Sequence, residues 1–157
     1  MAASPIIAMS RTWLSLPVLL LLALGCAVAQ QEGKFPYATV GLSCAPWDGP
    51  ANELHLSTTP LKCRQSDVIE VTISFWRDLP LHDNQTFSLD PKSNWGGASY
   101  CRGGHQPCER ATSGSIHMET ISQGKSARGT YELVFPKLGS VQGSFRADWC
   151  RMSIRCG

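Results

Sequence analysis

The sequence has no excess of charge of either sign. Its 157 residues include 14 Lys and Arg against 12 Asp and Glu, and setting aside the first 29 residues removes only one of these, Arg11. The remaining charges are scattered, with a minor cluster of Arg146, Arg151 and Arg155 near the C-terminus. Such a chain offers no basic patch for the phosphate backbone of nucleic acids, so we expect no nucleic-acid partner.

Motifs for metal, cofactor or nucleophilic chemistry are also lacking. No Cys-x-x-Cys pair occurs and none of the four histidines has zinc-finger spacing. The nearest approach to a metal-ligand group is His105, between Cys101 and Cys108. No Gly-x-Ser-x-Gly turn occurs to present a nucleophilic serine. We therefore expect no metal, no cofactor and no catalytic residue, and an enzyme is the lesser hypothesis.

A long uncharged, leucine-rich stretch opens the chain. Residues 12–31 carry no charge, and Arg11 precedes them, which is typical of a secretory signal peptide. The apolar run is shorter than the roughly 20 residues that a membrane-spanning helix needs, and Pro17 interrupts it. We expect residues 1–29 to be a signal peptide and residues 30–157 to form one exported domain, secreted or held at the cell envelope.

Two processing sites compete at the end of this leader. Ala27-Val28-Ala29 has the small residues that signal peptidase prefers, and cleavage there would release a domain starting at Gln30. Residues 23–26, Ala-Leu-Gly-Cys, resemble the lipobox of bacterial lipoproteins, with the first two residues in reversed order. That resemblance implies lipidation of Cys26 and a membrane contact through the lipid alone. Both alternatives stay open.

Six cysteines remain after the leader, an even number that predicts up to three disulfides in an exported chain. Each would contribute about 2–4 kcal/mol to stability. Fifteen pairings exist, and the sequence does not choose among them. Local closure across a Gly-rich segment favours Cys101 with Cys108. The remaining cysteines, by default, pair as Cys44 with Cys63 and Cys150 with Cys156.

Alternating apolar residues predict a mostly β domain. Residues 68–76 alternate strictly, with Ile69, Val71, Ile73 and Phe75 on one face. Residues 129–135 and 141–149 form a predicted hairpin across residues 136–140. We expect seven or eight short strands in a small antiparallel β-sandwich or barrel that could be monomeric. Further strands are predicted at residues 37–43, 53–56, 86–89, 98–101 and 115–121.

The predicted hairpin also carries a resemblance. Gly-Thr-Tyr-Glu-Leu at residues 129–133, followed after a turn by Gly-Ser-Phe-Arg-Ala-Asp-Trp-Cys at residues 143–150, resembles the C-terminal hairpin of small uncharacterised bacterial exported proteins and lipoproteins. This resemblance covers about the last thirty residues. It implies a β fold and an envelope location, and it carries no activity.

Two tryptophans in turn-rich segments, Trp47 and Trp95, are the first candidates for binding. An exposed indole beside polar groups suits stacking on a sugar or contact with a protein partner. The alternative is that each ring folds back to fill an end of the β core. Asn84 begins an Asn-x-Thr acceptor for N-linked glycan, which matters only in a eukaryotic secretory route.

Residues for catalysis are weaker candidates. Ser115, His117 and Glu119 would share one face of a strand, but an exposed strand face produces the same alternation of polar residues. A pair of loop carboxylates could serve a glycosidase, as in any protein with twelve acidic residues. The leading hypothesis is a non-enzymatic exported module that binds a protein or carbohydrate ligand. The alternatives are a small secreted hydrolase and a disulfide-rich inhibitor that presents the loop of residues 102–107.

Overall fold

The computed structural model describes residues 34–63, 70–77, 79–90, 92, 94–102, 107–151 and 153–157. Among these residues the fold is all-β, and none of them belongs to a helix long and apolar enough to cross a membrane. The leader predicted for residues 1–29, with its processing sites at Cys26 and Gln30, lies outside the described ranges. The strands are β1 (Tyr37–Cys44), β2 (Pro50–Ser57), β3 (Val71–Phe75), β4 (Gln85–Leu89), β5 (Gly96–Tyr100), β6 (Glu109–Arg110), β7 (Ser113–Ser122), β8 (Ser126–Phe135) and β9 (Gly139–Cys150).

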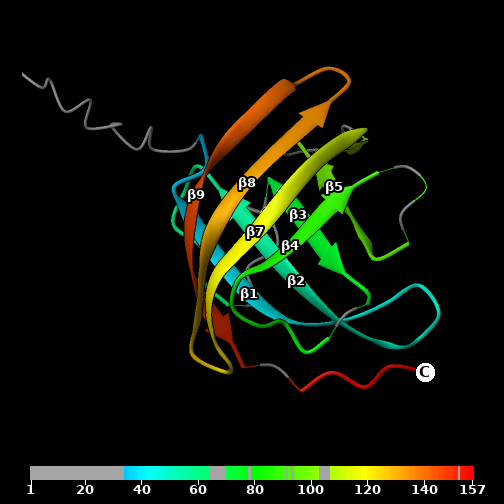
Figure 1. The fold of residues 1–157 in the computed structure, drawn as a ribbon, viewed down its shortest axis with the longest axis vertical. Coiled ribbons are helices and arrows are strands. Elements are labelled where there is room, and N and C mark those ends of the chain that lie inside the picture. The colour runs from blue at the N-terminus through cyan, green and yellow to red at the C-terminus, as the bar shows by residue number, and fades with distance from the viewer. Residues whose placement is uncertain are drawn as a thin grey trace, which may run out of the picture.

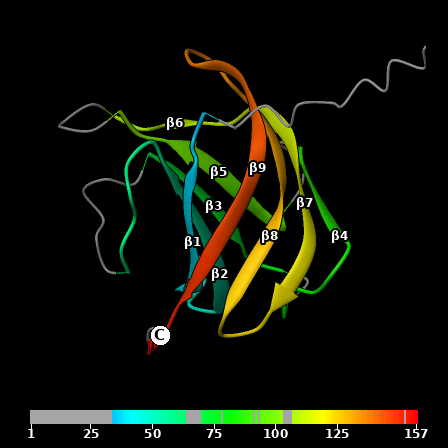
Figure 2. The same cartoon turned by 90° about the vertical axis from the view of Figure 1, so that its left-hand side faces the viewer.

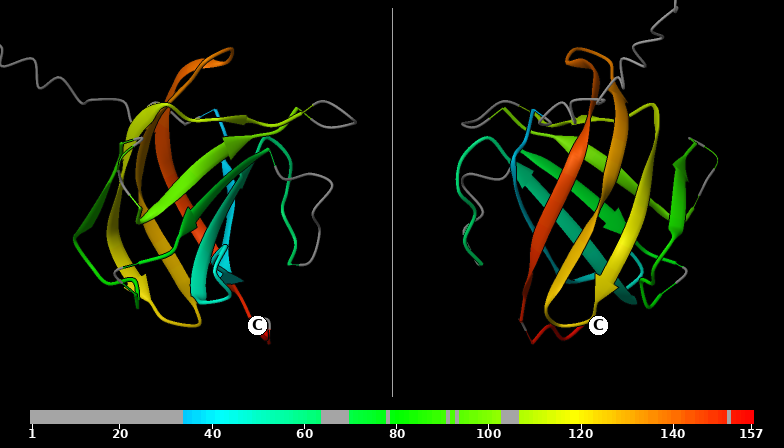
Figure 3. Two further views of the ribbon diagram at one scale, coloured as in Figure 1. Left: turned by 90° about the vertical axis from the view of Figure 1, so that its right-hand side faces the viewer. Right: turned by 60° about the vertical axis from the view of Figure 1, so that its left-hand side comes forward.

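All nine of these strands belong to one sheet, in the order β4-β7-β8-β9-β1-β2-β3-β5-β6. Neighbours are antiparallel except β1 and β9, which run side by side in the same direction (Figures 1 and 2). The sheet curls so that β7, β8 and β9, drawn in yellow to orange, face β2 and β3 across the interior (Figure 3). The result is a half-barrel, closer to the barrel expected from the sequence than to a sandwich of two sheets.

Alternation of apolar and polar residues places the core on the inside of this curl. In β3, Val71, Ile73 and Phe75 are buried, while Thr72 and Ser74 are half-buried on the outer face, as the sequence predicts. The predicted hairpin is confirmed as β8 and β9. Its inward side chains are buried, apart from the half-buried Trp149, and comprise Tyr131, Leu133, Phe135, Val141, Phe145 and Ala147.

The two edges of the sheet, β4 and β6, are not joined by a ladder of backbone hydrogen bonds. On the inner side of the gap between these edges, Trp95, just before β5, reaches β4, where its indole Nε1 donates to the carbonyl oxygen of Ser88. The two-residue strand β6 was not predicted, because two polar residues carry no alternation to detect. The gap between the two edges is called the open seam below, and a groove lies beside it.

Three disulfides brace the sheet, and their pairing corrects the sequence-based expectation. The Cys101–Cys108 bridge is confirmed, whereas the predicted pairings of Cys44 with Cys63 and of Cys150 with Cys156 are wrong. The bridges are Cys44–Cys156, Cys63–Cys150 and Cys101–Cys108.

The parallel contact between β1 and β9 explains the pairing. Gly41 of β1 lies opposite Cys150 of β9, and both strands run in one direction. The chain that continues beyond Cys150 therefore passes the end of β1, where Cys156 meets Cys44. Cys63, beyond the end of β2, is bonded to Cys150 of β9, which is thereby not available to Cys156. Local loop closure cannot anticipate a contact between strands so distant in sequence.

Candidate functional site

A groove of about 580 Å³ lies on the outer side of β3 and β5, beside the open seam. Its volume falls in the range of roughly 300–1,000 Å³ that is usual for small-molecule sites. Four separate parts of the chain line it. These residues are Thr72, Ser74 and Trp76, then Leu89 and Asp90, then Gly96, Gly97, Ala98 and Ser99, and finally Arg110, Ala111 and Thr112.

Small polar residues of β3 and β5 form the floor of the groove. Thr72 lies opposite Ser99, and Ser74 lies opposite Gly97, in the antiparallel ladder. These residues alternate with the buried core residues of their strands, so their side chains point outward. Gly97 adds no side chain to this surface, which leaves the floor open. A Cβ on Gly96 would lie 1.8 Å from the carbonyl oxygen of Ser74, so the close approach of the two strands requires glycine there.

Trp76 forms one wall of the groove. It follows β3 on the same face as Ser74, and its ring atom Cη2 lies 4.0 Å from the place of a Cβ built on Gly97. Trp47 packs edge-on against Trp76, with ring centroids 5.9 Å apart and planes at 79°. The guanidinium carbon of Arg77 lies 5.9 Å from the Trp47 ring centroid. We call Trp47, Trp76 and Arg77 the aromatic brace, because each contact limits the movement of the next ring.

Two exposed groups of opposite charge lie at the rim. Asp90 follows β4, and one of its carboxylate oxygens accepts a 2.8 Å hydrogen bond from the backbone N–H of Lys92. Arg110 lies in β6, opposite Ser99 of β5. A carboxylate only accepts hydrogen bonds, a guanidinium only donates them, and the hydroxyls of the floor do both. The groove therefore offers both donors and acceptors without a net charge.

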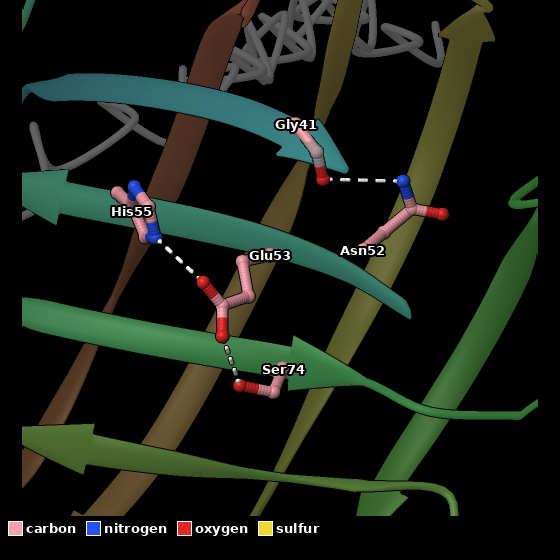
Figure 4. A network of polar contacts seen from close by, with 5 residues as sticks. All are labelled: Gly41, Asn52, Glu53, His55 and Ser74. Carbon is pink, nitrogen blue, oxygen red and sulfur yellow. Dashed lines mark hydrogen bonds and ion pairs between the residues drawn. The ribbon is translucent and has the colours of Figure 1, made fainter. Parts of the chain in front are cut away.

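Figure 4 shows a network of polar side chains beside the floor of the groove. The carboxylate of Glu53 lies between two donors, the Ser74 hydroxyl at 3.1 Å and His55 Nε2 at 3.2 Å. Hydrogen bonding to His55 lowers the pKa of Glu53 from its ordinary value, against the opposing effect of burial. Nearby, the Asn52 amide donates a 3.2 Å hydrogen bond to the carbonyl oxygen of Gly41. The carboxylate thus joins β2 to β3 and fixes the Ser74 hydroxyl.

This order of residues does not form a nucleophilic triad. In such a triad the histidine lies between the serine and the acid and takes the serine's proton. Here the carboxylate occupies the middle, and a carboxylate of lowered pKa is a weak base. Ser74 donates its proton to Glu53 and is not activated by His55. The network is suited to holding the floor of the groove rigid.

The two tryptophans predicted as contacts have different environments. Trp47 is 53% exposed and belongs to the aromatic brace. Trp95 is 9% exposed and fills the core, where its ring stacks on Phe75 at 5.8 Å and contacts Phe87 at 5.0 Å. Because Trp95 is buried, its ring is not part of the surface that a ligand could contact. It fills the β core, which was the alternative expected for it. Trp76, which sequence reasoning assigned only to a strand, takes its place beside the groove.

The polar residues of β7 contact neighbouring strands and are not among those that line the groove. His117 Nδ1 lies 2.9 Å from the Thr86 hydroxyl on β4, and a Glu119 oxygen lies 3.8 Å from Arg128 on β8. These contacts across the outer face, with a half-buried Ser115, are those of ordinary strand neighbours. The bulge between Met118 and Thr120 also removes Glu119 from the regular alternation of the strand.

The other candidate residues are scattered over the fold. Asn84 is exposed in the turn before β4, with a φ of 57°. Within the described ranges no three His, Cys, Asp or Glu side chains gather as a metal-ligand group, and His105 lies outside those ranges. The inhibitor loop proposed for residues 102–107 is described only at its ends, which the Cys101–Cys108 bridge joins.

Sequence reasoning missed the groove because its lining comes from four segments of the chain. The one local signal was Trp76, a large aromatic residue on the polar face of a strand otherwise marked by Thr72 and Ser74.

Comparisons with models of protein families, with curated proteins and with solved structures found no match to this chain.

Proposed function

We propose that this protein is an extracytoplasmic binding module that holds a small polar ligand in the groove beside the open seam. The observation that carries this proposal is the groove itself, about 580 Å³ in volume, with an aromatic wall, a hydroxyl-lined floor and one charge of each sign at its rim. Small-molecule sites combine apolar walls with a few fixed polar groups in this way. The aromatic brace and the carboxylate of Glu53 hold the site in shape before a ligand arrives.

The three disulfides support a location outside the cytoplasm. Bridges of this kind form and persist in oxidising compartments, such as the extracellular space or the bacterial periplasm. The signal peptide expected at residues 1–29 agrees with such a location. Release from the cell and attachment through a lipid on Cys26 are both compatible with this location.

Binding without catalysis fits the chemistry of the groove best. The acid and histidine nearest its floor are arranged to fix Ser74 and not to activate it. The acid at the rim, Asp90, is exposed and accepts a hydrogen bond from the backbone N–H of Lys92, so it holds a turn. The groove therefore offers recognition and no proton-transfer pair.

A substitution that fills the groove tests this function. A Cβ at Gly97 meets nothing closer than Trp76 Cη2 at 4.0 Å, so Gly97→Val adds bulk to the floor without disturbing the backbone. Gln142→Val, at an exposed position of β9, is the matched control. The purified disulfide-bonded protein is screened by ligand-observed NMR against a panel of neutral sugars, amino acids, nucleosides and small carboxylic acids.

We expect at least one compound to bind the wild-type protein and Gln142→Val equally, and to bind Gly97→Val at least tenfold more weakly. The proposal is wrong if nothing in the panel binds, or if binding is unaffected by Gly97→Val. Circular dichroism of all three proteins establishes that the valine variants keep the fold.

A further inference from the structure

We infer that the ligand of the groove is a neutral saccharide, an inference that rests on the proposed function and adds the chemical class of what is bound. Three independent features of the groove select this class. They are the balance of charge at its rim, the direction of the hydrogen bonds on its floor and the shape of its aromatic wall.

The rim gives no net advantage to a ligand of either charge. An anion is attracted by Arg110 and repelled by Asp90, and a cation the reverse, so a charged ligand pays the cost of leaving water without a net gain at the rim. A purely apolar ligand would remove both charges and the floor hydroxyls from water without replacing their hydrogen bonds, which is costly. A neutral ligand that carries many hydroxyl groups avoids these costs, because each hydroxyl can donate to Asp90 or accept from Arg110.

The floor has a fixed polarity that suits hydroxyl groups. The Ser74 hydroxyl donates its proton to Glu53 at 3.1 Å, so the lone pairs of its oxygen are left to accept from the ligand. Thr72 and Ser99, opposite each other in the ladder, add two hydroxyls that can rotate to donate or accept. Neighbouring hydroxyl groups on a sugar ring can therefore form hydrogen bonds with the side-chain hydroxyls that are already in position on the floor.

The wall and the open floor fit a flat ring with an apolar face. The Trp76 ring ends beside Gly97 and both residues line the groove, so a flat ring bound over Gly97 would contact the indole. One face of a pyranose presents mainly C–H groups, which pack on an indole at little entropic cost because the aromatic side chain is already held. The brace from Trp47 and Arg77 supplies that restraint, and the exposed Trp47 can extend the contact to a second sugar.

Titration with matched sugars tests the inference. The probes are glucose, galactose, mannose, N-acetylglucosamine and their β-linked disaccharides, each added to the disulfide-bonded protein and followed by saturation-transfer NMR and calorimetry. Glucuronate and glucosamine are the charged counterparts. We expect at least one neutral sugar to bind, and its anionic and cationic analogues to bind at least tenfold more weakly.

Variants separate this inference from the proposed function. Trp76→Ala and the milder Trp76→Phe should weaken sugar binding, by about tenfold or more for alanine, while Gln142→Val leaves it unchanged. The phenylalanine variant keeps the test valid if the alanine variant does not fold. Binding of a non-sugar compound that Gly97→Val abolishes, with no sugar bound, would overturn the saccharide inference and leave the proposed function standing. A charged analogue that binds more tightly than its neutral parent would also overturn it.

Discussion

The two long disulfides should stabilise the fold less together than the sum of what each would contribute alone, because one is nested inside the other. Cys44–Cys156 closes a loop with a sequence separation of 112, and Cys63–Cys150 closes one of 87 within it. When one bridge is already present, forming the other closes a loop that runs through the first bridge. That loop contains only about 25 residues, those from Cys44 to Cys63 and from Cys150 to Cys156. The chain-entropy relation assigns about 3.5 kcal/mol to closing such a path and about 4.8 kcal/mol to closing the full outer loop.

Removal of either bridge should therefore cost about 3.5 kcal/mol, and removal of both about 8 kcal/mol, more than the two single losses together. The variants are Cys44→Ala with Cys156→Ala, Cys63→Ala with Cys150→Ala, and all four substitutions combined. The free energy of unfolding is measured by urea denaturation of each oxidised protein. If the bridges instead joined cysteines close in sequence, Cys44 with Cys63 and Cys150 with Cys156, the two losses of unfolding free energy would add. Additive losses would therefore refute the nested arrangement and the parallel contact of β1 with β9 that produces it.

Two carboxylates allow further predictions. The pKa of Glu53 is lowered in the folded protein, so the stability it contributes is present above its ordinary value of 4.5 and is lost as pH falls through the lower folded value. Unfolding free energy should thus decline in acid for the wild type and decline less for Glu53→Gln, as denaturation at a series of pH values would show. Glu109 accepts hydrogen bonds from the backbone N–H groups of Lys137 at 2.8 Å and Leu138 at 3.1 Å. Glu109→Ala should cost about 1–3 kcal/mol and increase hydrogen exchange at those two amides, and unchanged exchange there would contradict this role.

The strands could be predicted from the sequence because their signal is local. Val71, Ile73 and Phe75 alternate with polar residues, and that period alone indicates a strand with one buried face. The β8–β9 hairpin carries the same signal on both sides of a short turn, so its two strands identify each other. In both cases the residues that determine the structure lie within a few positions of one another.

The disulfides and the groove could not be predicted in the same way, because they depend on how strands pair across the chain. Only the Cys101–Cys108 bridge, which closes a local loop, was found from the sequence. The other two bridges follow from the parallel contact of β1 with β9. The two tryptophans show the same limit, since similar turn-rich surroundings in sequence lead to an exposed Trp47 and a buried Trp95.

The open seam links the fold to the proposed function. The curled sheet ends at β4 on one side and β6 on the other, and no backbone ladder joins these edges. Trp95 closes the inner side of the gap through Ser88, while the outer side is left hollow between β3, β5 and the segments before and after. The groove thus lies beside the place where the two edges of the sheet are left unpaired.

The most direct test of the central claim is a map of where a neutral sugar contacts the protein. The ¹⁵N-labelled, disulfide-bonded protein is titrated with the tightest-binding sugar of the panel, and chemical shifts of backbone amides and indole N–H groups are followed. We predict that the largest changes occur at Gly97, Ser99 and the Trp76 indole, with the Trp95 indole unaffected because its N–H is held by Ser88. Changes confined to another face of the sheet, or no changes at saturating sugar, would contradict the account.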